Sequence, residues 1–282
     1  MRRVLVTGAT GRVGREVVTQ LLDAGVPVRA LTRRTATAAG LPAAVEVVTG
    51  DLTVPESLDK ALDGAETVFL VWTAPPATAA AVVERIASRS RRVVLLSSPH
   101  QTPHPFFQQP NPLAAFHARL EGLIKATGLA ATVIRPGMFA SNSVFWWAEA
   151  IRRGDVVRWP YGAVETAPID DRDIAAVAAR ALYDDGHAGG DYMITGPEPL
   201  SHAAQVRVIG EALGRPLRFV ELTPDEFRRE SGMPGPVADM LLAAWHAAEG
   251  HPAHVTSTVA QVLGSPARPF RRWAADHADA FR

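Results

Sequence analysis

The chain has 282 residues, of which 47% are hydrophobic and 21% charged, a composition typical of a globular protein with a full hydrophobic core. Its 29 basic and 29 acidic residues give no net charge, so charge provides no general attraction to nucleic acid or to an anionic membrane. The chain contains no cysteine, which excludes disulfides and cysteine-based metal sites. We see no signal peptide and no apolar run of membrane-spanning length, so we expect a cytoplasmic protein.

A glycine-rich turn follows the first predicted strand. Residues 4–6 form a short apolar run typical of a buried parallel strand, and Gly8, Gly11 and Gly14 follow before a helical pattern begins. Gly8 permits a tight turn, Gly11 lets backbone approach a pyrophosphate, and Gly14 lets the helix pack closely on the strand. The first N–H groups of that helix favour phosphate groups. The turn therefore predicts a dinucleotide-binding site with the candidate residues Gly8, Thr10, Gly11, Arg12, Val13 and Gly14.

Two arginines follow the second predicted strand, residues 28–32. A site that prefers NAD usually has an acidic residue about 20 residues after the glycine turn, where it binds the ribose hydroxyls. Arg33 and Arg34 stand at this position instead. Because guanidinium groups match a phosphate well, the pair predicts NADP(H) as the cofactor. A solvated basic strand end is the alternative.

An acidic residue follows the third predicted strand, residues 45–48. Asp51 has the right chemistry to accept a hydrogen bond from an adenine amino group while Leu52 packs near the ring. The alternative is an Asx-turn at the strand end. Thr53 and Glu56 have the spacing of a capping box, which predicts that a helix begins at this point.

The fourth and fifth predicted strands, residues 67–71 and 92–96, end in further candidate site residues. Trp72 and Thr73 follow the fourth strand, and Ser97 follows the fifth. The carboxyl ends of parallel strands meet at one edge of the sheet, where open α/β sheets bind their ligands. We therefore expect these three side chains to lie near the bound dinucleotide.

The segment 99–112 contains five prolines and cannot form a helix or a central strand. A loop of this length usually has a function. Phe106 and Phe107 favour a cover over an aromatic substrate. His100 and His104 raise the question of a metal, but the sequence supplies no further ligands, so we predict no metal site.

Strands and helices alternate up to about residue 140, which is typical of a doubly wound parallel sheet. The second half has helices, short strands and many aromatic residues, and Thr223 and Glu226 predict a capping box there. We expect an α/β Rossmann domain over residues 1–140 and a smaller, mostly helical substrate-binding lobe over residues 141–282. Some later segments should return to the first domain. The cleft between two such lobes is a preferred place for a small-molecule pocket.

Several motifs lie along essentially the whole chain. They include residues 7–14 (TGATGRVG), 50–52 (GDL), 134–139 (IRPGMF), 169–174 (IDDRDI) and 195–198 (TGPE). In these motifs the chain resembles the NmrA-like branch of the atypical short-chain dehydrogenase/reductases (SDRs). The resemblance implies a Rossmann domain that binds NADPH/NADP+ and a C-terminal lobe that forms the substrate pocket. It also implies that Pro136, Gly137 and Phe139 lie near the nicotinamide.

The resemblance fails at the catalytic residues. Other SDR reductases use a serine with a Tyr-x-x-x-Lys helix, in which the tyrosine donates a proton. Here Ser97 or Ser98 represents the serine, whereas His117 occupies the lysine position and Leu113 the tyrosine position. The candidate catalytic residues are therefore Ser97 and His117, which are also candidate cofactor contacts. Three sources remain for the proton: His117, water, or an acid on the substrate such as a phenol.

The sequence thus predicts an NADPH-dependent reductase that transfers hydride to a carbonyl of an aromatic, polyketide-like ketone or of a quinone. The resemblance makes an antibiotic-pathway ketoreductase one such enzyme. The alternative is a non-catalytic NADP(H) redox sensor that binds a regulator protein, which would explain the missing tyrosine. A nucleotide-sugar epimerase is disfavoured, because that chemistry depends on the missing Tyr-Lys pair.

Overall fold

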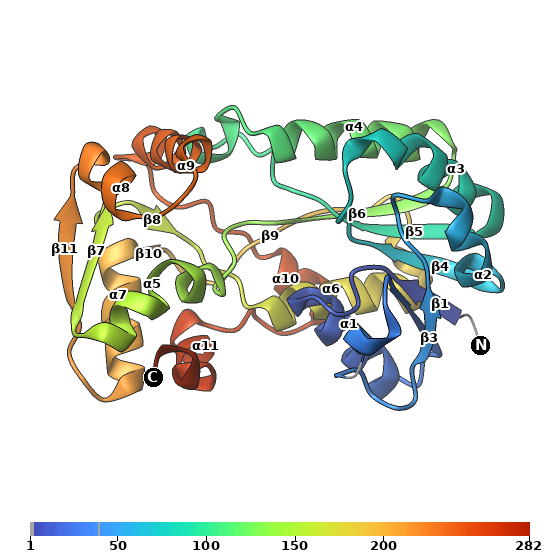
Figure 1. The fold of residues 1–282 in the computed structure, drawn as a ribbon, viewed down its shortest axis with the longest axis horizontal. Coiled ribbons are helices and arrows are strands. Elements are labelled where there is room, and N and C mark those ends of the chain that lie inside the picture. Colours follow the sequence, from blue (N-terminus) through green and yellow to red (C-terminus); the bar gives the residue numbers. More distant parts are fainter. Residues whose placement is uncertain (1–2, 39) are drawn as a thin grey trace.

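The computed structural model describes residues 3–38 and 40–282. Seven parallel strands form one sheet in the order β3-β2-β1-β4-β5-β6-β9 (Figure 1). The strand order reverses between β1 and β4, which marks the usual ligand-binding edge of such a sheet. The predicted doubly wound α/β fold is therefore confirmed. The strands are β1 Arg3–Val6, β2 Val28–Thr32, β3 Glu46–Thr49, β4 Ala65–Leu70, β5 Arg92–Leu96, β6 Ala130–Pro136 and β9 Asp191–Ile194.

The sheet is covered on both faces because its strands are apolar on both sides. Val4 and Val6 of β1 pack in one core with α1 (Arg12–Asp23) and α6 (Asp171–Tyr183), whereas Leu5 belongs to the core on the other face. Helix α6 comes from the second half of the chain but packs directly against α1. The remaining helices beside the sheet are α2 Asp59–Leu62, α3 Ala79–Arg89, α4 Pro112–Ala126 and α10 Thr258–Leu263.

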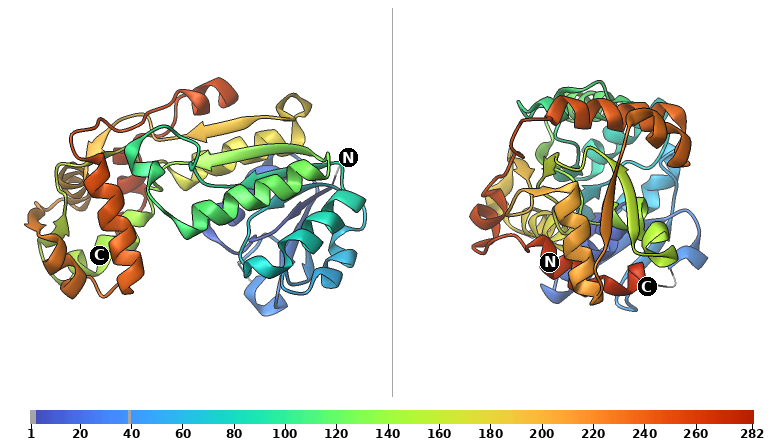
Figure 2. Two further views of the ribbon diagram at one scale, coloured as in Figure 1. Left: turned by 90° about the horizontal axis from the view of Figure 1, so that it is seen from above. Right: turned by 90° about the vertical axis from the view of Figure 1, so that its left-hand side faces the viewer.

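A second body lies beside the carboxyl edge of the sheet, and it holds the C-terminus (Figures 1 and 2). Its core is rich in tryptophan, with Trp147, Trp159, Trp245 and Trp273 all buried. Two small sheets belong to it, the parallel pair β7 and β11 and the antiparallel pair β8 and β10. Its elements are α5 Asn142–Arg153, β7 Val156–Pro160, β8 Glu165–Thr166, β10 Leu200–Ser201, α7 His202–Leu213, β11 Arg218–Leu222, α8 Pro224–Glu230, α9 Gly235–Ala248 and α11 Phe270–Asp276.

The capping box predicted at Thr53 and Glu56 is wrong. A short 3₁₀ turn over Pro55–Leu58 begins here, and its N-cap is Val54, which makes no side-chain capping bond. The backbone N–H of Thr53 instead donates to Asp51 Oδ1 at 2.8 Å. The predicted capping box of α8 is confirmed, with both of its reciprocal hydrogen bonds present.

The segment 99–112 is a loop with one 3₁₀ turn, Pro105–Gln108, which packs against α9. Its last residue, Pro112, is the first residue of α4, and the Asn111 side chain caps that helix. Proline is well suited to the first turn because its missing N–H has no partner there in any case. The loop thus connects the end of β5 to α4 while crossing to the second body.

Candidate active site

The glycine turn has the geometry that its three glycines require. Gly8 has a φ of +62°, in the left-handed region that favours glycine. A Cβ on Gly14 would lie 2.1 Å from the Gly8 carbonyl oxygen, so any side chain would force the helix away from the turn. Gly11 is the N-cap of α1 and offers no side chain to its first N–H groups. These N–H groups are therefore free to bind an anion.

A polar cavity of about 520 Å³ opens at this turn. It is bounded by the glycine turn, by the end of β2, by the residues after β3 and by the residues after β4. Most of the residues proposed from the sequence as cofactor contacts lie here. These are Gly8, Thr10, Gly11, Arg12, Val13, Gly14, Arg33, Arg34, Asp51, Leu52 and Thr73.

Asp51 forms the Asx-turn that the sequence left open as an alternative. Its hydrogen bond from the Thr53 N–H holds the pKa of the Asp51 carboxyl below its usual range. Asp51 also lines the polar cavity, so a structural role and a contact to a bound nucleotide do not exclude each other.

Three residues from the second half of the chain also line this cavity, and the sequence analysis assigned them no role. They are Ser141, Asn142 and Asp171. Arg12 Nη1 donates to the Ser141 carbonyl at 3.4 Å, and Ser141 Oγ donates to Asp171 Oδ1 at 3.0 Å. Burial raises the pKa of Asp171 above its usual value. The motif 169–174 contained Asp171, but only the fold brings it to the glycine turn.

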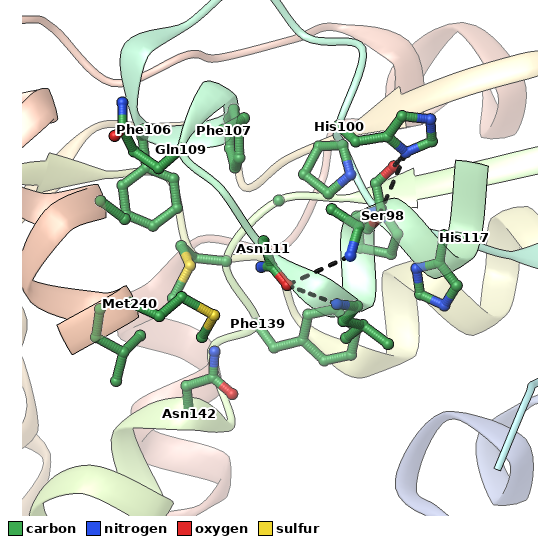
Figure 3. A pocket seen from close by; sticks show the side chains of 18 of the residues that line it. Ser98, His100, Phe106, Phe107, Gln109, Asn111, His117, Phe139, Asn142 and Met240 are labelled. Carbon is green, nitrogen blue, oxygen red and sulfur yellow. Dashed lines mark hydrogen bonds between the residues drawn. The ribbon is translucent and has the colours of Figure 1, made fainter. Parts of the chain in front are cut away.

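An apolar cavity, also of about 520 Å³, adjoins the polar one. Figure 3 shows side chains that line this apolar cavity. The two cavities share Val71, Leu96, Phe139 and Asn142 in their linings. Within the described chain, the lining of this second cavity, which we call the aromatic cavity, contains no Lys, Arg, Asp or Glu. The remaining sequence candidates lie here: Trp72, Ser97, His117, Pro136, Gly137 and Phe139.

The predicted cover loop forms one side of the aromatic cavity. In Figure 3, Phe106 and Phe107 lie on the opposite side of the cavity from His117, and Phe139 lies below them towards the centre of the view. Met240 of α9 adds to the wall next to the phenylalanines. The loop and the second body therefore close the cavity together, against the carboxyl edge of the sheet.

Ser97 is held by a buried ion pair. Its hydroxyl donates a hydrogen bond to Glu121, which lies on α4. Both oxygens of Glu121 accept from Arg135, each at 2.8 Å, and Arg135 Nε donates to Asp191 at 2.6 Å. Burial lowers the pKa of Arg135, but these hydrogen bonds more than offset it. Because a carboxylate paired with arginine only accepts, the Ser97 proton is committed to Glu121 and not to the cavity.

His117 is buried, and its Nδ1 has no hydrogen-bond partner among the described residues. Burial lowers the pKa of His117 below its usual value of 6.5, although Glu121 opposes the shift. The imidazole is therefore neutral at pH 7. Leu113, one helical turn earlier, is 57% exposed and lines the aromatic cavity at the position of the missing tyrosine.

The described residues contain no group of three or more His, Asp or Glu side chains arranged to hold a metal ion. Nor does any helix in the described ranges have the length and apolar character that crossing a membrane requires.

The profile of the NAD(P)H-binding family matches residues 8–185. The chain belongs to this family. It is an NAD(P)H-dependent oxidoreductase, as the resemblance implied, and it shares its fold with the transcriptional regulator NmrA, with a TM-score of 0.75 at 17% identity.

Two characterised reductases are similar to the chain along its whole length. It is 40% identical to a (4-alkanoyl-5-oxo-2,5-dihydrofuran-3-yl)methyl phosphate reductase of Streptomyces griseus and 34% identical to an NAD(P)H azoreductase of Xenophilus azovorans; both alignments cover 99% of each chain. Among solved structures, an Escherichia coli NADPH-dependent quinone oxidoreductase in complex with NADPH has a TM-score of 0.81 and 24% identity. That match covers 97% of this chain and 99% of the other.

Proposed function

We propose that the protein is an NADPH-dependent reductase that transfers hydride to a carbonyl of an uncharged aromatic ketone, polyketide-like in shape, or of a quinone. The observation that carries the proposal is the junction of the two cavities. A polar cavity with a glycine turn and two arginines adjoins an aromatic cavity of equal volume at Phe139 and Asn142. A dinucleotide in the first places its nicotinamide beside a substrate in the second. The nicotinamide supplies the hydride, and the chain supplies placement and a site with little water.

The preference for NADPH rests on Arg33 and Arg34. Both are exposed residues at the edge of the polar cavity. Their guanidinium groups are suited to the 2′-phosphate that distinguishes NADPH from NADH.

The proton is not supplied by Ser97, because its hydroxyl donates to Glu121. Neutral His117 is a weak acid at pH 7. The acceptors that suit this site are those that need no strong acid from the protein. A quinone is one, since its reduced form is aromatic. A ketone beside a phenol is another: hydride adds to the carbonyl carbon, the phenol proton moves to the carbonyl oxygen, and solvent restores the phenol proton.

The charge of the aromatic cavity favours an uncharged substrate. The Streptomyces relative is named for a phosphate-bearing substrate. The described lining of the cavity in this chain has no arginine or lysine to bind a phosphate. Its polar side chains are those of Ser97, Ser98, His100, Gln109, Asn111, His117 and Asn142.

The test is NADPH oxidation with purified protein and three sets of acceptors: quinones, aromatic ketones with a neighbouring phenol, and the matching O-methyl ethers. We expect turnover of the first or second set and at least about tenfold less with the ethers. Equal turnover of phenol and ether would contradict the proton source that we propose. Tight NADPH binding without turnover of any acceptor would favour the redox sensor instead.

A further inference from the structure

Large hydrophobic side chains gather on the rim of the aromatic cavity. Six such side chains are strongly exposed in the described chain, and three of them line this one cavity. They are Phe145, which is 73% exposed, Leu113, which is 57% exposed, and Val237, which is 40% exposed. We call these three residues the rim.

Packing within the protein does not explain the rim. In α5 the buried positions Trp147, Ala148 and Ile151 form the face that packs in the second body, and Phe145 lies outside that face. Leu113 lies four residues before His117, so it shares a face of α4 with it. Because these apolar side chains are exposed to water, they add little hydrophobic stabilisation to the fold.

The rim residues come from three different helices. Leu113 is the second residue of α4, Phe145 the fourth of α5 and Val237 the third of α9. These elements are far apart in the sequence, yet all three residues line the same cavity. The arrangement extends the apolar lining outward without adding a charged group from the described residues.

We propose that the rim binds an apolar extension of the substrate, an alkyl chain or a further ring, that continues out of the aromatic cavity. This proposal rests on the function proposed above and adds to it the size of the substrate. A cavity of about 520 Å³ holds one small molecule. A longer acceptor covers the rim, and the side chains at 145, 113 and 237 then set the preference for length.

The experiment uses 2-alkyl-1,4-naphthoquinones with chains from methyl to octyl, and measures kcat/KM at saturating NADPH. We expect kcat/KM to rise about tenfold with chain length, the effect of burying roughly two methylene groups. In the double variant Phe145→Ser and Val237→Ser, the ratio of kcat/KM between the octyl and the methyl compound should shrink to about twofold. Phe145→Leu should keep most of the rise.

Tyr183→Ser is the matched control. Tyr183 is 42% exposed but lines neither cavity, so its loss should leave the dependence on chain length intact. Equal dependence in wild type and rim variant would overturn the proposal while the proposed function stands. A wild-type dimer that dissociates in the rim variant, seen by size-exclusion chromatography, would make the rim a subunit interface and also overturn it.

The two proposals fail separately. If wild type reduces no acceptor, the proposed function fails, and the same quinones are then titrated into the NADP+-bound protein by tryptophan fluorescence. Dissociation constants that fall with chain length in wild type but not in the rim variant would still support the rim as an apolar binding surface. Constants independent of chain length would overturn it.

Discussion

Replacing Gly14 by alanine should weaken cofactor binding and lower the stability of a protein that still folds. The added Cβ would lie 2.1 Å from the Gly8 carbonyl oxygen, 2.7 Å from the Gly8 carbonyl carbon and 3.0 Å from the Ala9 Cα. All three atoms are backbone, so the start of α1 must move by about 1 Å or more to reach ordinary contact distances. Overpacking of this kind costs about 1–3 kcal/mol of stability. It also turns the first N–H groups of α1 away from the phosphates.

We therefore expect Gly14→Ala to melt several degrees lower than wild type and to bind NADPH at least about tenfold more weakly, measured by fluorescence titration of the folded protein. Gly122→Ala is the matched control. Gly122 lies within α4, where an added Cβ meets nothing within 4 Å, so this variant should gain about 0.5–1 kcal/mol and bind NADPH normally. Wild-type NADPH affinity in Gly14→Ala would refute the assignment of the turn as the phosphate site.

Three further predictions follow from charge and burial. Replacing Arg33 and Arg34 together by alanine should weaken NADPH binding about 10–100-fold and leave NADH binding unchanged, and equal losses would rule out a 2′-phosphate contact. His117→Gln should lower kcat by less than about tenfold, because a general acid would contribute about 100-fold or more and this imidazole is neutral at pH 7. Burial lowers the pKa of His202 to about 4, so its contribution to stability is complete above about pH 6.5 and declines by about 3 kcal/mol as the pH falls to 4. Urea unfolding from pH 7.5 to 4.5 should therefore show a flatter pH dependence in His202→Leu than in wild type.

The two capping boxes predicted from the sequence had different outcomes, and the position of a proline explains the difference. In α8 the proline follows the capping residue directly, as Thr223 and then Pro224, and the capping box forms. After β3 the proline stands one position later, and a proline disfavours the helical conformation of the residue before it. Val54 accordingly has a φ of −126° and a ψ of 82°, so the turn begins one residue later than Thr53 would require.

In the candidate site, the parts that could be predicted are those whose residues are close together in the sequence. The glycine turn and the two arginines could be predicted because strand, turn and helix are consecutive in the sequence. Glu121 could have been noticed, since it lies one helical turn after His117, but its bond to Ser97 depends on how α4 packs beside β5. Asp171 and Arg135 stood in motifs, yet their partners lie far away in the sequence. No periodicity or spacing specifies such contacts.

The ion pair between Arg135 and Glu121 determines which hydrogen bonds Ser97 can make in a site that lacks the Tyr-Lys pair. Arg135 is almost fully buried, and Glu121 accepts the hydrogen bonds that Arg135 and Ser97 donate. Ser97 satisfies one of these and presents only lone pairs to the aromatic cavity. A hydroxyl in that state cannot polarise a carbonyl, but it can accept from a hydroxyl or an amide. His117, which is neutral at pH 7, lines the same cavity. The site can therefore position an acceptor for hydride but supplies little acid. A suitable substrate is one that needs no strong acid from the protein.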